Sequence, residues 1–275
     1  MTELLHTIRL DVADSIRARW FIVYALVFGG LVAVLAGLGL AESRVLGFTG
    51  LSRLLVTFIQ LSMAILPVFV LISTVRSLAG DREAGVLEYM LSLPVPLPAW
   101  YWGRFIGRFA VVFLPVFLAM AGAALYGAAI GASIPWMQLA LYTGLLVSLA
   151  TCFLGLGFLI SSLARGVDVA QGIAILVWLT LVLFLDLILL GLMIKGQAPI
   201  GIVVAVALAN PLQAFRAAAM MLFDAELVML GPSAYVILDA FGYAGYLAWA
   251  LLYPLALGLL FGTIGFLSFR SRDLP

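Results

Sequence analysis

The amino-acid sequence predicts an all-α polytopic membrane protein with six transmembrane helices in a single domain, residues 1–275. Of its 275 residues, 65% are hydrophobic and only 10% are charged, and the mean hydropathy is +1.24. Soluble domains average roughly 45–50% apolar and about 25% charged residues, because polar side chains must cover their surfaces. This composition excludes a soluble enzyme, a disordered chain and a nucleic-acid-binding protein, and it favours a chain surrounded by a lipid bilayer.

Six segments have the length and the lack of charge that a membrane-crossing helix requires. About 20 apolar residues cross the hydrocarbon core as a helix, and lipid offers no partners to backbone groups in other conformations. Only one of the six carries a charged residue, Asp186. The predicted spans are residues 20–41, 54–75, 109–132, 136–164, 169–194 and 241–268.

The stretch 198–223 is apolar but interrupted. Asn210-Pro211 disfavours a helix that continues through it, because proline restricts the residue before it and lacks a backbone donor, and Arg216 follows. We therefore expect a pair of short helices at one membrane face, within a periplasmic segment 196–240. A seventh span is the alternative.

The basic residues are distributed unequally between the two sides that these spans define. Cytoplasmic segments of membrane proteins carry an excess of Lys and Arg. With six spans and a cytoplasmic N-terminus, ten basic residues lie inside and four outside, whereas a seventh span would make the distribution eight against six. Six spans with both termini cytoplasmic are therefore favoured. The inner residues are Arg9, Arg17, Arg19, Arg76, Arg82, Arg104, Arg108, Arg165, Arg270 and Arg272, and the outer ones are Arg44, Arg53, Lys195 and Arg216.

Residues 1–19 combine charges with regularly spaced apolar side chains. Leu5, Ile8, Val12 and Ile16 recur at nearly helical spacing, with charged residues between them. This pattern predicts an amphipathic helix that lies along the inner leaflet and leads into the first span. A solvated leader is the alternative.

The cytoplasmic loop 76–108 contains the most specific pattern of the sequence. Gly80 and Asp81 can begin a short helix, with Glu83 in its first turn favoured by the helix dipole, and the prolines within 94–98 end it. No core in this chain is expected to bury its apolar stripe. The helix is therefore predicted to pack on the membrane surface or in a groove of another protein. The stripe consists of Val86, Leu87, Met90 and Leu91.

Three aromatic residues and two arginines follow these prolines. Trp100, Tyr101 and Trp102 precede Arg104 and Arg108. Aromatic rings and long basic side chains are enriched where a membrane meets water. This part of the loop is therefore predicted to form an interfacial helix that leads into the third span.

The same loop resembles a known family. Residues 81–88 read Asp-Arg-Glu-Ala-Gly-Val-Leu-Glu, and residues 91–94 read Leu-Ser-Leu-Pro. They are similar to the first cytoplasmic loop of ABC-2 type transporter permeases, although Val86 stands where many members have Thr. The resemblance implies an ABC-2 (type V exporter-like) fold in which this segment is a coupling helix that inserts into a separate ATPase subunit. The implied ATPase-coupling residues are Asp81, Arg82, Glu83, Gly85, Leu87, Glu88 and Leu91.

A second contact with the ATPase is predicted in the tight inner loop between the fourth and fifth spans. Arg165 and Asp168 lie there. The alternative is a local ion pair that caps the turn and contributes little to stability.

The resemblance covers nearly the whole chain and extends to a subgroup, the permeases that serve nitrous oxide reductase maturation. Gln213 departs from that subgroup, which often has an acidic residue at this position. The strings that carry the resemblance are Leu46-Gly47-Phe48-Thr49-Gly50, Trp178-Leu179, Val182-Leu183, Asp186-Leu187, Leu189-Leu190-Gly191-Leu192, Asn210-Pro211 and Phe215-Arg216.

The resemblance also implies partners and a location. A bacterial inner-membrane permease of this kind works with a second copy of itself, two ATPase subunits that hold ATP and Mg, and a periplasmic accessory protein for copper–sulfur site assembly. The chain itself lacks the G-x-x-x-x-G-K-[ST] motif of nucleotide-binding loops, so we expect no cofactor on it. Two small-x-x-x-small pairs, Gly127/Gly131 and Gly258/Gly262, have the spacing that packs membrane helices.

Asp186 is the only ionisable residue deep within a predicted span. A charge at the centre of a membrane helix costs about 2.5–3.5 kcal/mol on insertion scales, so such residues are functional by default. Asp186 is predicted either to face a dimer interface or polar pathway, or to be a neutral group that holds helices together.

Three residues of the outer segment have two interpretations. Asn210, Pro211 and Arg216 could shape a docking surface for a periplasmic protein. Alternatively, Asn210 caps a helix that begins near Pro211, and Arg216 extends towards the headgroups.

Neither a catalytic site nor a metal site is expected in this chain. Cys152 and His6 are the only residues of their types, which excludes a thiolate cluster or a histidine-based triad within one chain. Met220, Met221 and Met229 could suit Cu(I), but methionine is also common filler in apolar helices. The rival functions are export of another substrate (a drug, lipid or polysaccharide), ion-coupled secondary transport and intramembrane catalysis.

Overall fold

The computed structural model describes residues 2–17, 21–30, 48–91, 95–129, 131, 136–184, 191, 200–223 and 232–272. All regular secondary structure in these ranges is helical. The helices are Phe21–Gly30, α1 (Thr2–Arg17), α3 (Phe48–Glu83), α4 (Val86–Leu91), α5 (Leu97–Ala129), α6 (Trp136–Leu163), α7 (Val167–Leu179), η1 (Thr180–Phe184), α9 (Ile200–Ala209), α10 (Pro211–Phe223) and α11 (Pro232–Arg272).

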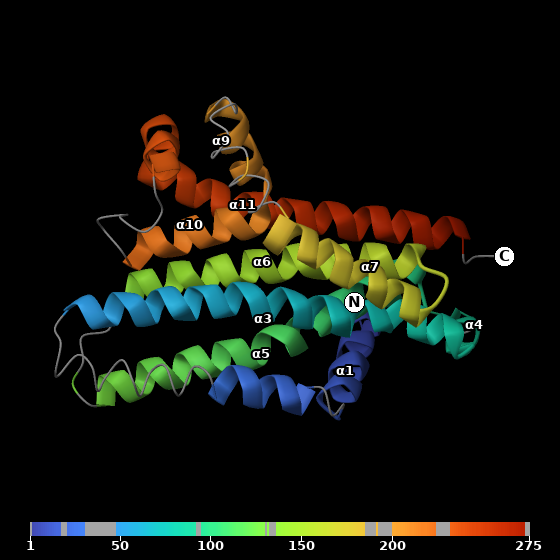
Figure 1. Ribbon diagram of the computed structural model, residues 1–275. Coiled ribbons are helices and arrows are strands. Elements are labelled where there is room, and N and C mark those ends of the chain that lie inside the picture. Colours follow the sequence, from blue (N-terminus) through green and yellow to red (C-terminus); the bar gives the residue numbers. More distant parts are fainter. Residues whose placement is uncertain are drawn as a thin grey trace.

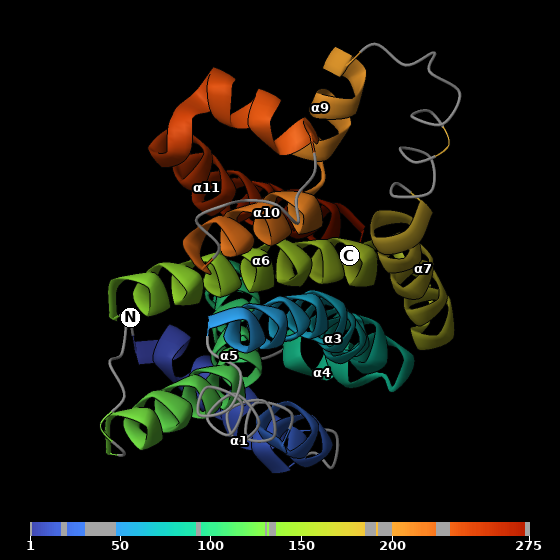
Figure 2. The ribbon, with the colours of Figure 1, turned by 60° about the vertical axis from the view of Figure 1, so that its left-hand side comes forward.

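Four long helices, α3, α5, α6 and α11, form an elongated bundle (Figure 1). Helix α6 lies between α3 and α11, with α10 packed beside it, and both views show this arrangement (Figures 1 and 2). Helix α1 packs against α5, and α7 packs against α3. Helix α11 bends at Gly242, where a φ of 67° interrupts the helical conformation. This position explains why α6 contributes several of the largest fully buried side chains, namely Tyr142, Leu145, Phe153 and Phe158.

Within the described ranges, four segments are long and apolar enough to cross a membrane. They are Ile59–Glu83, Leu97–Tyr126, Trp136–Leu163 and Phe241–Ser271. Two shorter apolar helices, Phe21–Gly30 and Val167–Leu183, lie within or close to the predicted first and fifth spans. The remaining parts of those two spans, residues 31–41 and most of 185–194, lie outside the described residues.

Helices α3 and α5 extend well beyond the spans predicted from charge-free segments. Helix α3 continues to Glu83, and α5 begins at Leu97. The expected interfacial helix is not a separate element, because its residues form the first turns of α5. Trp100 and Tyr101 are buried instead of anchoring a membrane surface, and the hydroxyl of Tyr101 donates a 3.0 Å hydrogen bond to the carbonyl of Gly262.

Glycines allow α6 and α11 to approach each other closely. A Cβ atom at Gly155 would collide with the carbonyl oxygen of Gly258, and a Cβ at Gly258 would collide with the carbonyl oxygen of Thr151. A Cβ at Gly262 would lie 3.1 Å from the ring of Phe105. The predicted pair Gly258/Gly262 thus packs helices within one chain. Of the other predicted pair, Gly131 has a φ of 80° and lies at a turn.

The break at Asn210 divides this part of the chain into two short helices, as predicted. The side-chain oxygen of Asn210 accepts a 3.0 Å hydrogen bond from the amide of Leu212, which caps α10. Its side-chain nitrogen donates a 2.9 Å hydrogen bond to the carbonyl of Leu181 in the π-helical turn η1. Helix α10 does not lie on the surface of the bundle, because it packs on α6, α11 and α3.

The carbonyl groups before Asn210 find partners on α11. The indole of Trp249 donates a 3.3 Å hydrogen bond to the carbonyl of Leu208, and the hydroxyl of Tyr253 donates a 2.6 Å hydrogen bond to that of Ala209. The last carbonyls of a helix have no partner within the helix. In apolar surroundings such groups are costly, so α11 stabilises the break.

Candidate functional site

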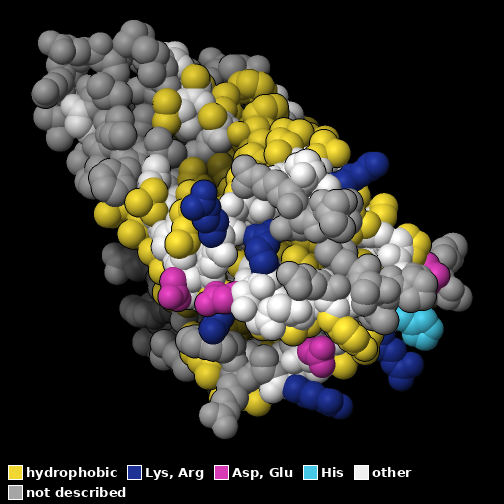
Figure 3. Space-filling view, turned by 90° about the vertical axis from the view of Figure 1, so that its right-hand side faces the viewer, with side chains coloured by type: hydrophobic (Ala, Val, Ile, Leu, Met, Phe, Trp, Pro, Cys, Tyr) yellow, Lys and Arg dark blue, Asp and Glu magenta, His cyan; other side chains and the backbone are white. Residues whose placement is uncertain are grey.

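Charged side chains gather at one end of the bundle, which we call the charged end. It is formed by the C-terminal ends of α3, α6 and α11, the N-terminal ends of α5 and α7, and the short helix α4 (Figure 1). Figure 3 looks onto this end and shows acidic and basic side chains spread among hydrophobic ones. The rings of Trp100 and Phe269 stack with centroids 5.6 Å apart, which joins α5 to α11 here.

The last turn of α3 contains three of the predicted coupling residues. Asp81, Arg82 and Glu83 end α3, so the prediction that Asp81 begins a new helix is wrong. After Glu83 the chain turns at Gly85, whose φ of 68° is costly for any residue with a Cβ atom. The amide of Gly85 donates a 3.2 Å hydrogen bond to the carbonyl of Arg82, as in other helix ends that close on a left-handed glycine.

Two of these side chains reach the turn between α6 and α7. The guanidinium of Arg82 donates a 2.6 Å hydrogen bond to the carbonyl of Ala164, and the carboxylate of Glu83 accepts a 3.0 Å bond from the amide of Val167. A helix carries a partial negative charge at its C-terminus and a partial positive charge at its N-terminus. The cation therefore meets the end of α6, and the anion meets the start of α7.

Asp81 and Arg104 join α3 to α5. They form an ion pair in which both side chains are mostly buried. The guanidinium of Arg104 also lies 4.6 Å from the ring centroid of Trp100, in a cation–π arrangement, and donates a 3.5 Å hydrogen bond to the carbonyl of Ser77. These contacts hold the end of α3 against the start of α5, where the sequence analysis expected two separate short helices.

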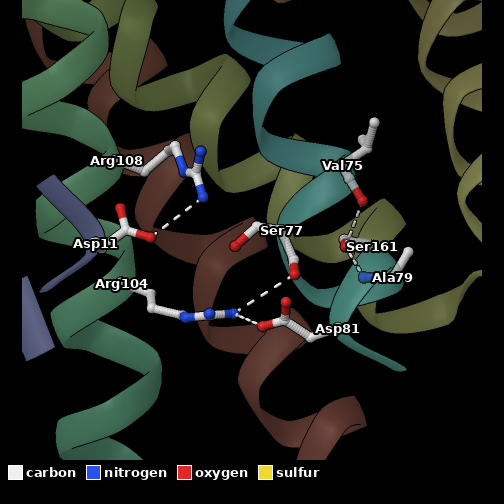
Figure 4. A network of polar contacts seen from close by, with 8 residues as sticks. All are labelled: Asp11, Val75, Ser77, Ala79, Asp81, Arg104, Arg108 and Ser161. Atoms are coloured by element: carbon white, nitrogen blue, oxygen red, sulfur yellow. Dashed lines mark hydrogen bonds and ion pairs between the residues drawn. The ribbon is translucent and has the colours of Figure 1, made fainter. Parts of the chain in front are cut away.

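A serine of α6 is inserted into the hydrogen bonding of α3. The hydroxyl of Ser161 accepts a 2.9 Å hydrogen bond from the amide of Ala79 and donates a 2.8 Å bond to the carbonyl of Val75 (Figure 4). These two backbone groups are four residues apart and would bond to each other in a regular helix. Insertion of a side chain into this ladder is a known cause of local bending.

Helix α1 is held against α5 by a polar contact and two glycines. Asp11 and Arg108 form an ion pair at 3.1 Å, shown in Figure 4. A Cβ at Gly103 would lie 2.8 Å from the Cβ of Thr7, and one at Gly107 would lie 3.0 Å from that of Asp11, so only glycine admits α1 here without adjustment. Burial raises the pKa of the Asp11 carboxyl, and the neighbouring Arg108 opposes part of that shift.

Helix α4 buries one of the apolar residues that were expected to lack a core. Leu87 is 4% exposed and belongs to the hydrophobic core of the chain, whereas Val86 and Tyr89 are exposed by 38% and 66%. The expectation that this chain cannot bury the stripe is therefore wrong for Leu87. The side chains of Glu88 and Leu91 lie outside the described residues.

The second predicted contact lies at the charged end, next to the last turn of α3. Arg165 and Asp168 are exposed. A Cβ atom at Gly166, between them, would lie 3.6 Å from a carboxylate oxygen of Glu83. Among the described residues, neither makes an ion pair, so the alternative of a local ion pair at this turn is not observed. The two loops predicted to contact an ATPase are thus adjacent and joined through Arg82 and Glu83.

The other predicted site residues lie elsewhere. Asn210 and Pro211 are buried and Arg216 is partly buried, so this group does not form an open surface in the observed packing. Asp186 lies outside the described residues. In the described part of the chain, no group of three His, Cys, Asp or Glu side chains is arranged to hold a metal ion, and Met220 and Met221 are buried in the core.

Sequence reasoning missed Ser161, Arg104 and the glycines that receive α1. Gly103 and Gly107 have the small-x-x-x-small spacing, so that pattern was available in the sequence. No local pattern distinguishes Ser161 from other serines in apolar helices.

Comparison with known proteins identifies the family. The sequence model of the family described as "ABC-2 family transporter protein" matches residues 5–274. The chain belongs to the ABC-2 transporter family. This ABC-2 permease is also similar to the probable ABC transporter permease protein NosY of Pseudomonas aeruginosa, at 28% identity over 226 residues, which covers 79% of this chain and 81% of the relative. A protein of the same name from Stutzerimonas stutzeri is 26% identical over 204 residues, covering 72% and 73% of the two chains.

Membership of this family confirms the resemblance predicted from the loop 81–94. An ABC-2 permease is a non-catalytic, multi-pass membrane subunit of an ABC transporter, which agrees with the long apolar helices and with the lack of a nucleotide-binding motif in the sequence.

Proposed function

We propose that the charged end of this ABC-2 permease docks a separate ATPase subunit and transmits its ATP-driven motion through the membrane. The observation that carries the proposal is the joining of the two loops at this end by Arg82 and Glu83. Because side chains from the end of α3 hold both the end of α6 and the start of α7, a force on either loop acts on three helices together. The charged end would then face the cytoplasm, with both termini on that side.

The exposed residues at this end define the docking surface. Val86 and Tyr89 present apolar area on α4, and Arg165 and Asp168 present opposite charges on the neighbouring turn. A short helix with exposed anchors beside a polar rim is suited to a groove on a partner. Leu87 acts from behind this surface, because its burial fixes α4 to the bundle.

The packing provides a route from this surface to the other end of the bundle. Ser161 joins α3 to α6, and the contact of Gly155 with Gly258 joins α6 to α11 without intervening side chains. Trp249 of α11 then holds the break between α9 and α10. Closely packed elements move as units, so displacement of α6 would reach α9 and α10.

We propose further that the motion serves copper–sulfur site assembly of nitrous oxide reductase in a bacterial inner membrane. The support is the similarity to two proteins named NosY over most of the chain. The assembly would contain a second copy of the chain, two ATPase subunits that carry ATP and Mg, and a periplasmic accessory protein. In this scheme copper is handled by other components, and the chain supplies movement.

Co-purification with a co-expressed ABC ATPase subunit tests the docking surface. Tyr89→Asp places a charge on the exposed face of α4 and is expected to reduce the recovered ATPase at least tenfold. Ser271→Asp places the same charge at an exposed position of the same end, on α11, and is the matched control. Equal recovery with both variants would contradict the docking role.

A second measurement tests the biological assignment. Cells that lack this gene are expected to make nitrous oxide reductase protein with a reduced content of copper and sulfide at its cluster. A fully loaded enzyme in those cells would contradict the assignment to this pathway and would favour export of another substrate.

A further inference from the structure

A cavity of about 690 Å³ opens between the helix Phe21–Gly30, α3 and α5. Its walls are almost entirely apolar, and Trp178 of α7 completes them. The rings of Tyr24 and Phe69 stack in the wall with centroids 3.6 Å apart, so this side of the cavity is rigidly packed.

The cavity is elongated along α3. Its lining on this helix repeats at helical spacing from Ile65 through Phe69 and Ile72 to Arg76. The eleven rises from Ile65 to Arg76, at about 1.5 Å each, give a length of roughly 16 Å, which is about half of the ~30 Å hydrocarbon thickness of a bilayer. The apolar lining therefore has the length of one leaflet.

The charged groups of the cavity lie at one of its ends, towards the charged end of the bundle. Arg76, Arg108 and Ser15 line it there. Arg108 is already paired with Asp11, but its Nε atom is buried and has no hydrogen-bond partner among the described residues. Arg76 is exposed and makes no ion pair within the same part of the chain, so this end of the cavity carries a net positive charge.

We propose that this cavity binds an anionic phospholipid from the leaflet at the charged end. An acyl chain lies along the apolar lining residues of α3. The phosphate lies between Arg76 and Arg108 and accepts a hydrogen bond from the Nε–H of Arg108. Arginine guanidinium groups are well matched to phosphate oxygens. The long apolar lining favours a phospholipid over a free phosphate, because a free phosphate has no acyl chain to cover that lining. An anionic lipid is favoured over a zwitterionic one because the latter brings a second cation close to Arg76.

This inference does not rest on the proposed coupling function, because the cavity involves none of the residues of the docking surface. A chain that fails to bind an ATPase is still expected to retain the lipid.

Lipid retention measured by native mass spectrometry tests the proposal. The full chain is purified in detergent, incubated with equal amounts of dioleoylphosphatidylglycerol and dioleoylphosphatidylcholine, and scored for bound lipid. The wild-type chain is expected to retain dioleoylphosphatidylglycerol preferentially. Arg76→Gln is expected to lower that retention about tenfold, the usual scale for one charge-assisted contact. Arg270→Gln removes an exposed arginine at the same end, away from the cavity, and is expected to have no effect.

A second variant separates the cavity from a general surface charge effect. Ile72→Trp fills the apolar part of the cavity without changing its charge and is expected to lower retention as strongly as Arg76→Gln. Equal retention by the Arg76 and Arg270 variants, or full retention by Ile72→Trp, overturns the proposal. If Arg76→Gln or Ile72→Trp leaves the amount of bound lipid unchanged but converts a dimer of the chain into a monomer, the proposal is also overturned. The cavity would then be covered by a second copy of the chain.

Discussion

Arg82 in the last turn of α3 donates a 2.6 Å hydrogen bond to the carbonyl of Ala164 at the end of α6. The two residues are 82 positions apart in the sequence. Arg82 belongs to the segment that the resemblance implies is the coupling segment, and Ala164 adjoins the turn in which Arg165 and Asp168 were predicted to make a second contact with an ATPase. The contact makes the two loops one mechanical unit.

Replacement of Arg82 by glutamine is expected to loosen this unit. A hydrogen bond from a charged donor contributes about 1.5–3 kcal/mol, so its loss should increase hydrogen exchange of the amides of residues 164–168 by about tenfold or more. Arg82→Lys keeps the charge without the planar fork and should be intermediate. Arg270→Gln, a matched loss of an exposed arginine, should leave exchange in this turn unchanged. Protection that is equal in all three variants contradicts the link.

Removal of the Ser161 hydroxyl tests its insertion into α3. Ser161→Ala frees the carbonyl of Val75 and the amide of Ala79 to bond with each other, so α3 should straighten while its contact with α6 weakens. The expected loss of stability is about 1 kcal/mol, with altered hydrogen exchange at Ala79. Ser162→Ala is the control, because the Ser162 hydroxyl donates to the carbonyl of Phe158 in its own helix. Exchange at Ala79 that responds equally to both variants counts against the insertion.

A methyl group at Gly258 is expected to force α6 and α11 apart. Its Cβ would collide with the backbone of Thr151, which cannot rotate away as a side chain can, so Gly258→Ala should lower the unfolding temperature through a loss of about 1–3 kcal/mol. Gly172→Ala serves as the control. A Cβ at Gly172 meets nothing within 4 Å, so the change should be neutral or slightly stabilising. A Gly258→Ala chain as stable as the wild type would show that the helices have room to adjust.

The docking of α1 on α5 is expected to strengthen as the pH falls. Burial raises the pKa of Asp11 above its ordinary value of 3.8, and its second oxygen has no hydrogen-bond partner in the described part of the chain. The folded state therefore binds the proton more tightly than the unfolded state. Protonation of Asp11 therefore contributes to the stability of the docked α1. This contribution is complete below pH 3.8 and is lost as the pH rises through the raised pKa of the folded state.

Hydrogen exchange of the α1 amides, corrected for intrinsic rates, measures this dependence. Protection should increase as the pH is lowered from 7 towards 4 in the wild-type chain, and Asp11→Asn should remove the trend because it does not titrate. A trend of equal size in the variant would assign the pH dependence to another group.

The membrane class and the family of this protein could be predicted from the sequence because they depend on composition and on local strings. Long charge-free segments predict helices that cross a bilayer, whatever their neighbours are. The pair of short helices around Asn210 was also predictable, because proline acts on the backbone next to it. The string 81–94 was sufficient to predict the family.

The tertiary structure alone decided how the charged residues are used. Asp81 lies in the last turn of α3 and Arg104 lies near the start of α5, and their charges compensate each other across the two helices. The tertiary structure also decided the environment of Leu87. The apolar stripe to which it belongs predicted an external partner, whereas the bundle buries Leu87. Hydrophobicity and proline act on the chain locally, whereas charge compensation and close packing depend on residues far away in sequence. The sequence therefore determined the membrane helices and the family, and only the fold decided which loops are joined and which surface is left to a partner.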